Sequence, residues 1–190
     1  MIARAGLGAS TAALLAAAKV IAPNAPTQTL MRACLAVEGA TDPLGFDAFD
    51  QLIWASRTAE IIARCAPPPR FQVVGALWGE GQITDPQDTR FADISDLIAD
   101  WQDATQMQDR DACAKIATRS ATLCSEFRGP SDDPSLQIAQ DINALGVIRA
   151  HTGSARGFLF EPGNAPSSAL PLLQEAGYSN ALTFETGGET

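Results

Sequence analysis

The beginning of the chain places two glycines directly before a long, apolar, alanine-rich segment. The residues are Gly6-Leu7-Gly8-Ala9-Ser10-Thr11-Ala12-Ala13, and the apolar segment 14–22 that follows ends at Pro23. Glycine lets the backbone approach a ligand closely, and serine or threonine is a favoured N-cap, so the pattern predicts a helix capped by Ser10 or Thr11. The first amides of such a helix lack partners within it and carry partial positive charge. Phosphate is the natural ligand of such a site.

Two alternatives to a phosphate site stay open for these residues. Small residues before an alanine-rich helix also suit tight helix packing. Met1, Arg4 and the following apolar run resemble an export signal, but Lys19 interrupts that run. A Walker loop, in contrast, is excluded, because the Gly-Lys-Ser/Thr ending is absent and the first lysine is Lys19.

Composition excludes several classes of protein. Hydrophobic residues make up 46% of the 190 residues and charged residues 18%, which indicates a globular chain of one large or two small domains. It has no uninterrupted apolar run of about 18 residues, so the sequence predicts no spanning helix. A net charge of −9 argues against nucleic acid and anionic membranes as partners, because a field of this sign repels phosphate polymers.

The four cysteines are scattered and form no C-x-x-C pair, so they signal neither a zinc site nor a redox motif. We expect buried free thiols in a reducing, cytoplasmic setting. Cys113 and Cys124 lie eleven residues apart, which puts both on one face if their segment is helical. His151 is the single histidine, which excludes His-rich metal sites.

The first third of the chain is predicted to form two helices and a loop with two carboxylates. Thr27 is placed to cap a second helix over 29–37, which delivers Glu38 at its end, and Asp42 follows in the loop 39–45. The segment 46–65 is ambiguous, since 52–55 suits a strand and 59–64 suits a helix. Three prolines at 67–69 mark a predicted boundary between subdomains 1–66 and 67–190.

The remainder alternates strands and helices. We expect strands at 71–78, 147–150, 158–160 and 181–184, and helices at 91–104, 109–127, 134–145 and 167–176. Such interleaving indicates an α+β sandwich with helices on one face of a small, largely antiparallel sheet.

Three motifs occur in an order that resembles the GHMP kinase superfamily, named for galactokinase, homoserine, mevalonate and phosphomevalonate kinases. Residues 6–12 look like its Gly-Leu-Gly-Ser-Ser-Ala-Ala phosphate loop, and 152–157 look like its late Thr-Gly-Ala-Gly-Gly-Gly loop. The closest likeness is to the L-threonine kinases of propanediol utilisation and cobalamin synthesis. Their Ser-Ser-Thr-Ala-Asp, Glu-Pro-Thr-Asp and Ala-His-Ser-Gly-Thr motifs correspond to 9–13, 38–42 and 150–154. Ala13 replaces the family's aspartate, and the Glu-to-Asp interval is one residue longer.

The resemblance implies a GHMP-kinase-like fold of two subdomains. Residues 67–190 would form a C-terminal ferredoxin-like α/β sandwich, and residues 1–66 a partial N-terminal subdomain with the phosphate loop. Family members begin with an N-terminal strand region of several dozen residues, whereas this sequence starts almost at the phosphate loop. The resemblance therefore predicts a truncated N-terminal subdomain.

The implied activity is ATP-dependent phosphorylation of a small molecule's hydroxyl group, with L-threonine as the leading acceptor and Mg²⁺ as the metal. Asp42 would be the catalytic residue, and Ser10 and Glu38 would hold the metal. The two remaining groups of implied site residues are the phosphate-binding Gly6, Leu7, Gly8, Ala9, Ser10 and Thr11, and the substrate-binding His151, Thr152, Gly153 and Ser154.

Other functions stay open beside the kinase. The chain is alternatively a non-catalytic nucleotide- or metabolite-binding remnant, which Ala9 and Ala13 favour, or a structural domain that needs a partner chain. A homodimer also remains open. Among single residues, Glu38 and Asp42 are alternatively a solvated pair capping a loop, and Arg156 either contacts an acidic group or points outward.

Overall fold

The computed structural model describes residues 6–80, 85, 88 and 90–187. In these residues the strands form two antiparallel sheets, one of two strands and one of four in the order β4-β5-β3-β6. The small sheet pairs β1 (Leu52–Ala55) with β2 (Glu60–Arg64). The large sheet contains β3 (Gln72–Leu77), β4 (Gly146–Arg149), β5 (Ala155–Phe160) and β6 (Ser179–Glu185).

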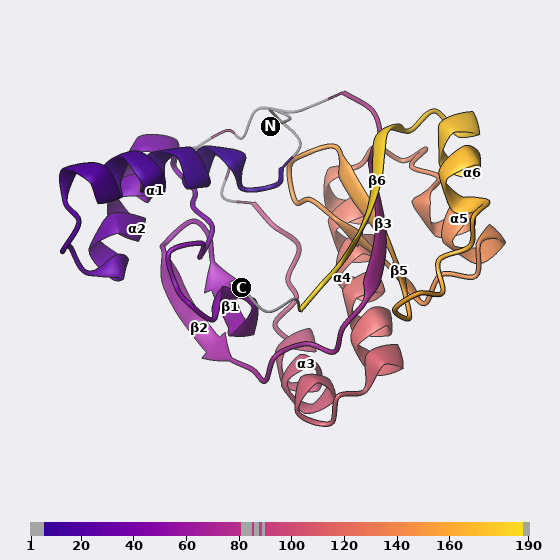
Figure 1. Cartoon of the computed structure of the whole chain (residues 1–190), viewed down its shortest axis with the longest axis horizontal. Coiled ribbons are helices and arrows are strands. Elements are labelled where there is room, and N and C mark those ends of the chain that lie inside the picture. The colour runs from indigo at the N-terminus through magenta and orange to yellow at the C-terminus, as the bar shows by residue number, and fades with distance from the viewer. Residues whose placement is uncertain (1–5, 81–84, 86–87, 89, 188–190) are drawn as a thin grey trace.

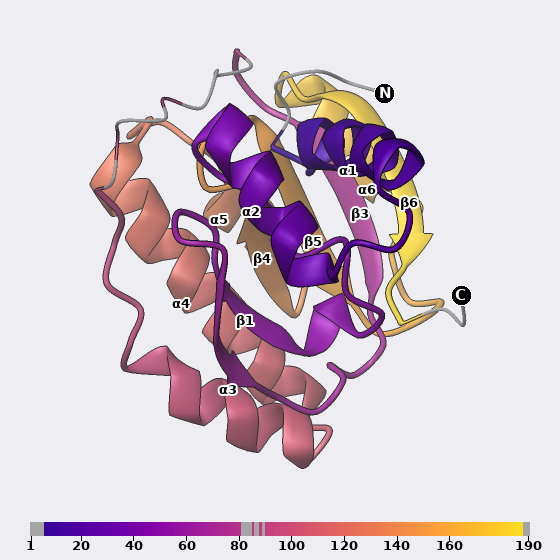
Figure 2. The ribbon, with the colours of Figure 1, turned by 90° about the vertical axis from the view of Figure 1, so that its left-hand side faces the viewer.

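The helices divide between the two sheets (Figure 1). Helices α1 and α2 lie on the side of β1 and β2, and the later helices surround the four-stranded sheet, as Figure 2 shows from a second direction. Their bounds are α1 (Ala9–Ile21), α2 (Thr27–Glu38), α3 (Leu97–Gln106), α4 (Arg110–Arg128), α5 (Ser135–Asp141) and α6 (Ala169–Glu175), with a short 3₁₀ helix at Phe49–Gln51. No helix of the described residues combines the length and hydropathy of a membrane span.

Helix α1 starts where the sequence predicts, but its cap differs. The N-cap is Gly8, in the left-handed region at φ 69°, and no side chain caps the helix, so the expectation that Ser10 or Thr11 does so is wrong. Likewise Thr27 is the first residue of α2, behind an N-cap at Pro26, and caps nothing. Apolar side chains join the two helices, with Leu15, Leu30, Met31 and Cys34 all buried in one cluster.

The segment 59–64, expected to be a helix, is instead strand β2. It pairs with β1 from Ala55↔Glu60 to Leu52↔Arg64, and its side chains alternate between exposed and half-buried. Ala59 turns the chain at φ 54° just before the strand. The alternation of Glu60, Ile61, Ile62, Ala63 and Arg64 fits a half-buried strand, and the pairing overrides the local preference for helix.

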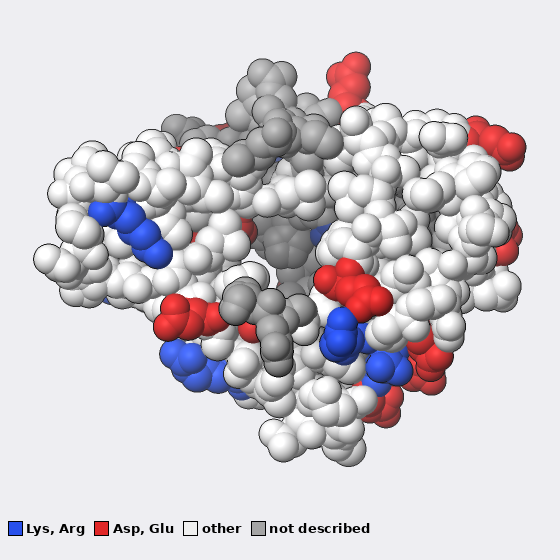
Figure 3. Space-filling model, in the orientation of Figure 1, with Lys and Arg blue, Asp and Glu red and all other residues white. Residues whose placement is uncertain are grey.

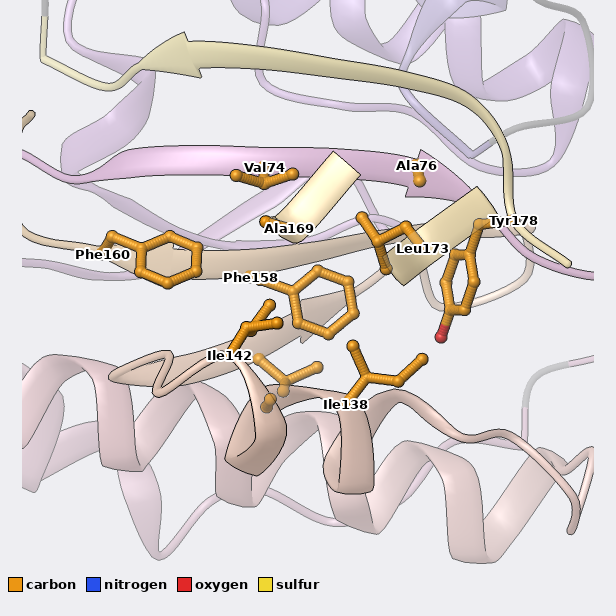
Figure 4. Close-up of a cluster of buried hydrophobic side chains, with 11 residues drawn as sticks. Val74, Ala76, Ile138, Ile142, Phe158, Phe160, Ala169, Leu173 and Tyr178 are labelled. Atoms are coloured by element: carbon orange, nitrogen blue, oxygen red, sulfur yellow. The ribbon is translucent and has the colours of Figure 1, made fainter. Parts of the chain in front are cut away.

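Helices cover both faces of the four-stranded sheet, which corrects the prediction of one covered face. On one face, Val74 and Phe158 pack against α5 and α6 (Figure 4). On the other face, Val73 and Leu159 pack against α3 and α4. All six residues of β5 are buried, as expected of a strand enclosed on both sides. The α+β class itself is confirmed.

Further predictions for this part of the chain are confirmed. Strands β3, β4 and β6 and helices α4 to α6 lie within or close to the predicted ranges. Helix α3 starts at Leu97 rather than at residue 91, and strand β5 starts at Ala155 rather than at residue 158. Cys113 and Cys124 are both buried on α4, and the cysteines Cys34, Cys65, Cys113 and Cys124 are free.

A buried ion pair joins β5 to the start of α5. Arg156 Nε lies 2.7 Å from Asp133 Oδ2, and the two side chains are only 2% and 8% exposed. The same carboxylate accepts hydrogen bonds from the Ser135 backbone N–H and hydroxyl, and that hydroxyl also contacts Tyr178. Of the two sequence-based interpretations of Arg156, the contact with an acidic group is therefore correct.

Candidate functional site

Three segments that are far apart in the sequence meet at the start of α1. A Cβ placed on Gly6 would lie 2.6 Å from Ala150 Cβ and 3.1 Å from Gly153 Cα. A Cβ placed on Gly8 would lie 3.0 Å from Asp42 Oδ2. The two glycines therefore leave the space through which the loop 150–154 and the carboxylate of Asp42 reach the helix.

The start of α1 has the features of an anion cradle. Gly6 and Gly8 adopt φ values of 78° and 69°, which L side chains rarely adopt. The first hydrogen bond of the helix runs from Ala12 N to Gly8 O, so the preceding amides have no helical partner, and no described contact supplies one. Leu7 and Ser10 are exposed beside them. These features fit a phosphate group.

Thr11 connects the helix to the acidic loop. Its hydroxyl donates to Glu38 Oε2 at 3.4 Å and accepts from the Asp42 backbone N–H at 3.3 Å, and the residue is only 3% exposed. The loop is held from behind by Trp54, whose indole N–H donates to Thr41 O at 2.7 Å. The hydroxyl that contacts Glu38 thus belongs to Thr11, while Ser10 lies exposed one position earlier.

The charges at this site perturb one another. Partial burial is the largest influence on the pKa of Glu38 and raises it. The hydrogen bond from Thr11 lowers this pKa, and the charge of Asp42 raises it further. Burial likewise raises the pKa of Asp42, and the opposing influence is the positive charge of His151. Desolvation and then Arg128 and Arg149 lower the pKa of His151. Perturbed carboxylates and a histidine that act on one another are typical of functional sites.

The oxygen atoms present fit a magnesium ion better than a transition metal. The described residues contain no group of three or more His, Cys, Asp or Glu side chains able to hold a metal. Mg²⁺ is usually bound by one or two carboxylates together with substrate phosphates, so a protein cage is not required. Glu38 and the hydroxyls of the first turn of α1 supply donors of the hard type that this ion prefers.

The loop 151–154 is held in place from the large sheet. The backbone N–H of Trp78 donates to Ser154 O at 2.9 Å, and Arg156 Nη1 donates to Gly153 O at 3.2 Å. Gly153 and Ser154 are buried, whereas His151 keeps access to solvent. The structure therefore brings together the turn at the start of α1, Glu38, Asp42 and the loop that carries His151.

A cavity of about 260 Å³ begins at His151 and extends between α3, α4, β1 and β4. Most of its lining is apolar, and its polar residues are Ser120, Arg149 and His151. Sequence reasoning did not foresee this cavity. Figure 3 shows a hollow in the surface between the side that carries α1 and α2 and the side that carries the large sheet.

The comparisons with known proteins establish the fold. The chain is similar to L. major mevalonate kinase in complex with R-mevalonate, with a TM-score of 0.62 and 13% identity over 94% of this chain and 65% of the kinase. It is also similar to homoserine kinase from Cytophaga hutchinsonii, with a TM-score of 0.60 and 14% identity over 98% of this chain and 67% of the kinase. No protein-family model and no curated protein matches the sequence. The chain thus spans about two thirds of the length of these kinases and has the fold of GHMP kinases.

Proposed function

We propose that this chain binds ATP and transfers its γ-phosphoryl group to the hydroxyl of a small molecule. The observation that carries the proposal is the position of Thr11, which joins Glu38 and Asp42 to the turn with the unpartnered amides. The fold shared with kinases of mevalonate and homoserine supports it. L-threonine is the acceptor implied by the motifs at 9–13, 38–42 and 150–154.

In this proposal the backbone amides of residues 6–11 hold the phosphates of ATP. Ser10 and Glu38 hold Mg²⁺, with Thr11 orienting the carboxylate of Glu38. When bound, the ion neutralises charge on the phosphate oxygens. His151 and the loop 152–154 contact the acceptor.

Asp42 accepts the proton of the acceptor hydroxyl. The hydroxyl oxygen forms a bond to the γ-phosphorus, the bond between that phosphorus and the β–γ bridging oxygen breaks, and ADP leaves. Positioning and charge stabilisation supply most of the rate enhancement in such transfers. The required parts are a cradle, a carboxylate and an acceptor pocket, and each has a candidate in this chain.

Two measurements on the whole chain test the proposal. Calorimetric titration with Mg-ATP detects nucleotide binding, and ADP release with a panel of hydroxy compounds that includes L-threonine detects transfer. A catalytic kinase gives both signals. A non-catalytic remnant binds without acceptor-dependent ADP release, and a structural domain that needs a partner chain gives neither signal.

The Gly6→Ala substitution should weaken Mg-ATP binding by about tenfold or more, because overpacking of this kind costs about 1–3 kcal/mol. The new methyl group would meet Ala150 Cβ at 2.6 Å, so the turn and the loop 150–154 must move apart. Gly163→Ala is the matched control, since Gly163 has a similar φ of 80° and nothing within 4 Å. Equal affinities of the two variants, measured by calorimetry, would contradict the assigned cradle.

The pH dependence of kcat/KM should show an acid limb from Asp42. Its pKa is raised above 3.8, so the rate should fall as the pH falls through that raised value. The positive charge of His151 lowers this pKa, and therefore His151→Gln should move the limb to higher pH. Initial rates between pH 4 and 8 test this, and a limb that does not move would show that His151 and Asp42 act independently.

A further inference from the structure

The loop 39–42 is hydrogen-bonded to the segment 54–57, which ends strand β1 and turns toward β2. The indole N–H of Trp54 donates to Thr41 O at 2.7 Å, and the backbone N–H of Thr41 donates to Ser56 O at 2.9 Å. These two bonds hold the middle of the loop. The backbone nearer to α2 is held by a charged side chain from the same segment.

Arg57 supplies this third contact. Its Nη1 donates to Gly39 O at 2.8 Å, and Gly39 ends α2 in the left-handed region at φ 70°. Gly39 lies between Glu38 and Asp42 in the sequence, so the bond acts on the backbone from which both carboxylates extend. A hydrogen bond from a charged donor is stronger than one between neutral groups. Arg57 therefore restrains the loop at the position where the two carboxylates separate.

The same guanidinium reaches the part of the chain beyond β3. Its Nη2 donates to Asp85 O at 3.1 Å, and its Cζ lies 5.4 Å from the centroid of the Phe91 ring. Arg128, the last residue of α4, lies over the same ring at 4.6 Å. Both distances are those of cation–π contacts. The Phe91 ring also lies 6.2 Å from the ring of His151, so Phe91 connects Arg57 to the loop 151–154.

The cluster of Arg57, Phe91 and Arg128 contains groups that do not serve stability. Arg128 is paired with Asp88, at 2.8 Å between Nη1 and Oδ2, whereas the hydrogen bonds of Arg57 to Gly39 and Asp85 run to backbone carbonyls. The Nε of each arginine is buried without a hydrogen-bond partner among the described residues. A buried donor without an acceptor costs free energy, and such local costs concentrate at functional sites.

We infer that Arg57 is a positioning residue of the proposed phosphoryl transfer, which sets the place of Asp42 by holding Gly39 O while Phe91 and Arg128 fix its guanidinium. This inference rests on the proposed function and adds to it a residue that contacts neither ATP nor the acceptor. On one side the cluster restrains the acidic loop, and on the other it contacts His151. It thereby fixes the separation of the two loops that meet at α1.

Hydrogen exchange of the Asp42 backbone amide measures this positioning without any turnover. The amide donates to Thr11 Oγ1 at 3.3 Å, so it exchanges when the loop moves away from α1. Arg57→Met should accelerate its exchange at least about tenfold, because a charged hydrogen bond and a cation–π contact are lost. Arg64→Met is the matched control, since Arg64 is exposed on the neighbouring strand β2 and its loss should leave this rate unchanged.

A second amide separates a local effect from loss of the whole fold. Phe158 is fully buried in the interior strand β5, so exchange of its amide reports global unfolding. Arg57→Met should change the rate at Asp42 more than the rate at Phe158. An unchanged rate at Asp42, or the same acceleration at both amides, would overturn the inference.

Two further variants test the geometry of the cluster. Arg57→Lys keeps the charge, but an ammonium group lacks the planar fork that binds two carbonyls while it stacks on a ring, so exchange should be accelerated nearly as much as in Arg57→Met. Phe91→Leu removes the ring and should have a smaller effect in the same direction. The two effects should be non-additive in the variant that combines Arg57→Met with Phe91→Leu. Full rescue by lysine, or strict additivity, would contradict the stacked arrangement.

Steady-state kinetics on the whole chain provide the second readout. Arg57→Met should lower kcat by about tenfold or more, because small misplacements of reacting groups can cost about 10²-fold. The KM for Mg-ATP should stay nearly the same, since Arg57 makes no described contact with residues 6–11. Arg64→Met should keep both constants. A raised KM with an unchanged kcat would overturn the positioning role.

The outcomes separate this inference from the kinase proposal. If the native chain shows no turnover, the kinase proposal fails, and the exchange rates still decide whether Arg57 fixes the acidic loop. If the native chain is active and Arg57→Met retains the native kcat, the positioning role is wrong and the kinase proposal stands. Slower turnover together with faster exchange at Asp42 supports both.

Discussion

Replacement of Arg156 by methionine is expected to lower the free energy of unfolding by about 3–5 kcal/mol, because removal of one partner leaves the charge of Asp133 buried without compensation. Both side chains are almost fully enclosed, at 2% and 8% exposure. Chemical denaturation monitored by circular dichroism measures the change. The substitution also removes the donor to Gly153 O, so the loop 151–154 loses one of its supports.

A matched surface pair provides the control. Arg70 and Glu185 lie 2.5 Å apart, but their side chains are 58% and 42% exposed. Arg70→Met should therefore change the stability by no more than about 1 kcal/mol. Adding Asp133→Asn to Arg156→Met should restore part of the loss, since the unpaired charge is then gone. A similar loss from both arginine substitutions would contradict the role assigned to burial.

The stability that Arg156 contributes should also depend on pH and should decrease as the pH falls. Burial alone would raise the pKa of Asp133, but hydrogen bonds from Ser135 and Arg156 outweigh it and hold the pKa below 3.8. A depressed pKa means that the pair's stabilisation is fully present above the unfolded value and is lost as the pH falls through the folded value. The stability difference between the native protein and Arg156→Met should therefore shrink at acid pH.

Asp42→Asn is expected to reduce kcat by about 10²–10⁴-fold, the usual contribution of a positioned general base. Asparagine has nearly the same shape, and the backbone N–H that donates to Thr11 is unchanged, so nucleotide affinity should persist. Single-turnover measurement of ADP formation separates the chemical step from binding. A loss confined to KM would assign Asp42 to binding instead.

Asp47→Asn is the control for that substitution. Asp47 lies five residues later in the chain and is exposed, and its loss should leave kcat unchanged. If Asp42→Asn retains full turnover while Asp47→Asn does not, the assignment of the catalytic carboxylate is wrong. If neither variant nor the native chain shows turnover, Mg-ATP titration still decides whether the cradle binds nucleotide.

Local patterns in the sequence predicted most of the helices and strands, but not that helices cover both faces of the four-stranded sheet. The glycine pair, Pro23 and the apolar run predicted α1, and alternation was enough for β3. The prediction of a helix over 59–64 failed because a six-residue stretch carries too little periodicity to distinguish strand from helix, and its pairing with β1 decided the outcome. The prediction of a single covered face failed because helix placement depends on packing between distant segments, such as Val73 and Cys113 in one cluster.

The candidate site was likewise predicted only in part from the sequence. The positions of Glu38 and Asp42 beside the first helix agree with the arrangement that the motifs predict, although their roles stay proposals. The function of Thr11 as a link to both was not foreseen, since a hydroxyl at a helix start normally indicates a cap. The cavity could not be predicted from the sequence because residues from 53 to 151 contribute to it without a shared local pattern.

The contact of Gly6 with Gly153 has a consequence for biosynthesis. Residues 7–152 separate these two glycines in the sequence, yet a Cβ placed on Gly6 would lie 3.1 Å from Gly153 Cα. During translation the first helix emerges long before the loop 150–154, which follows strand β4. The proposed phosphate site is therefore incomplete in any nascent chain that has not yet reached residue 153.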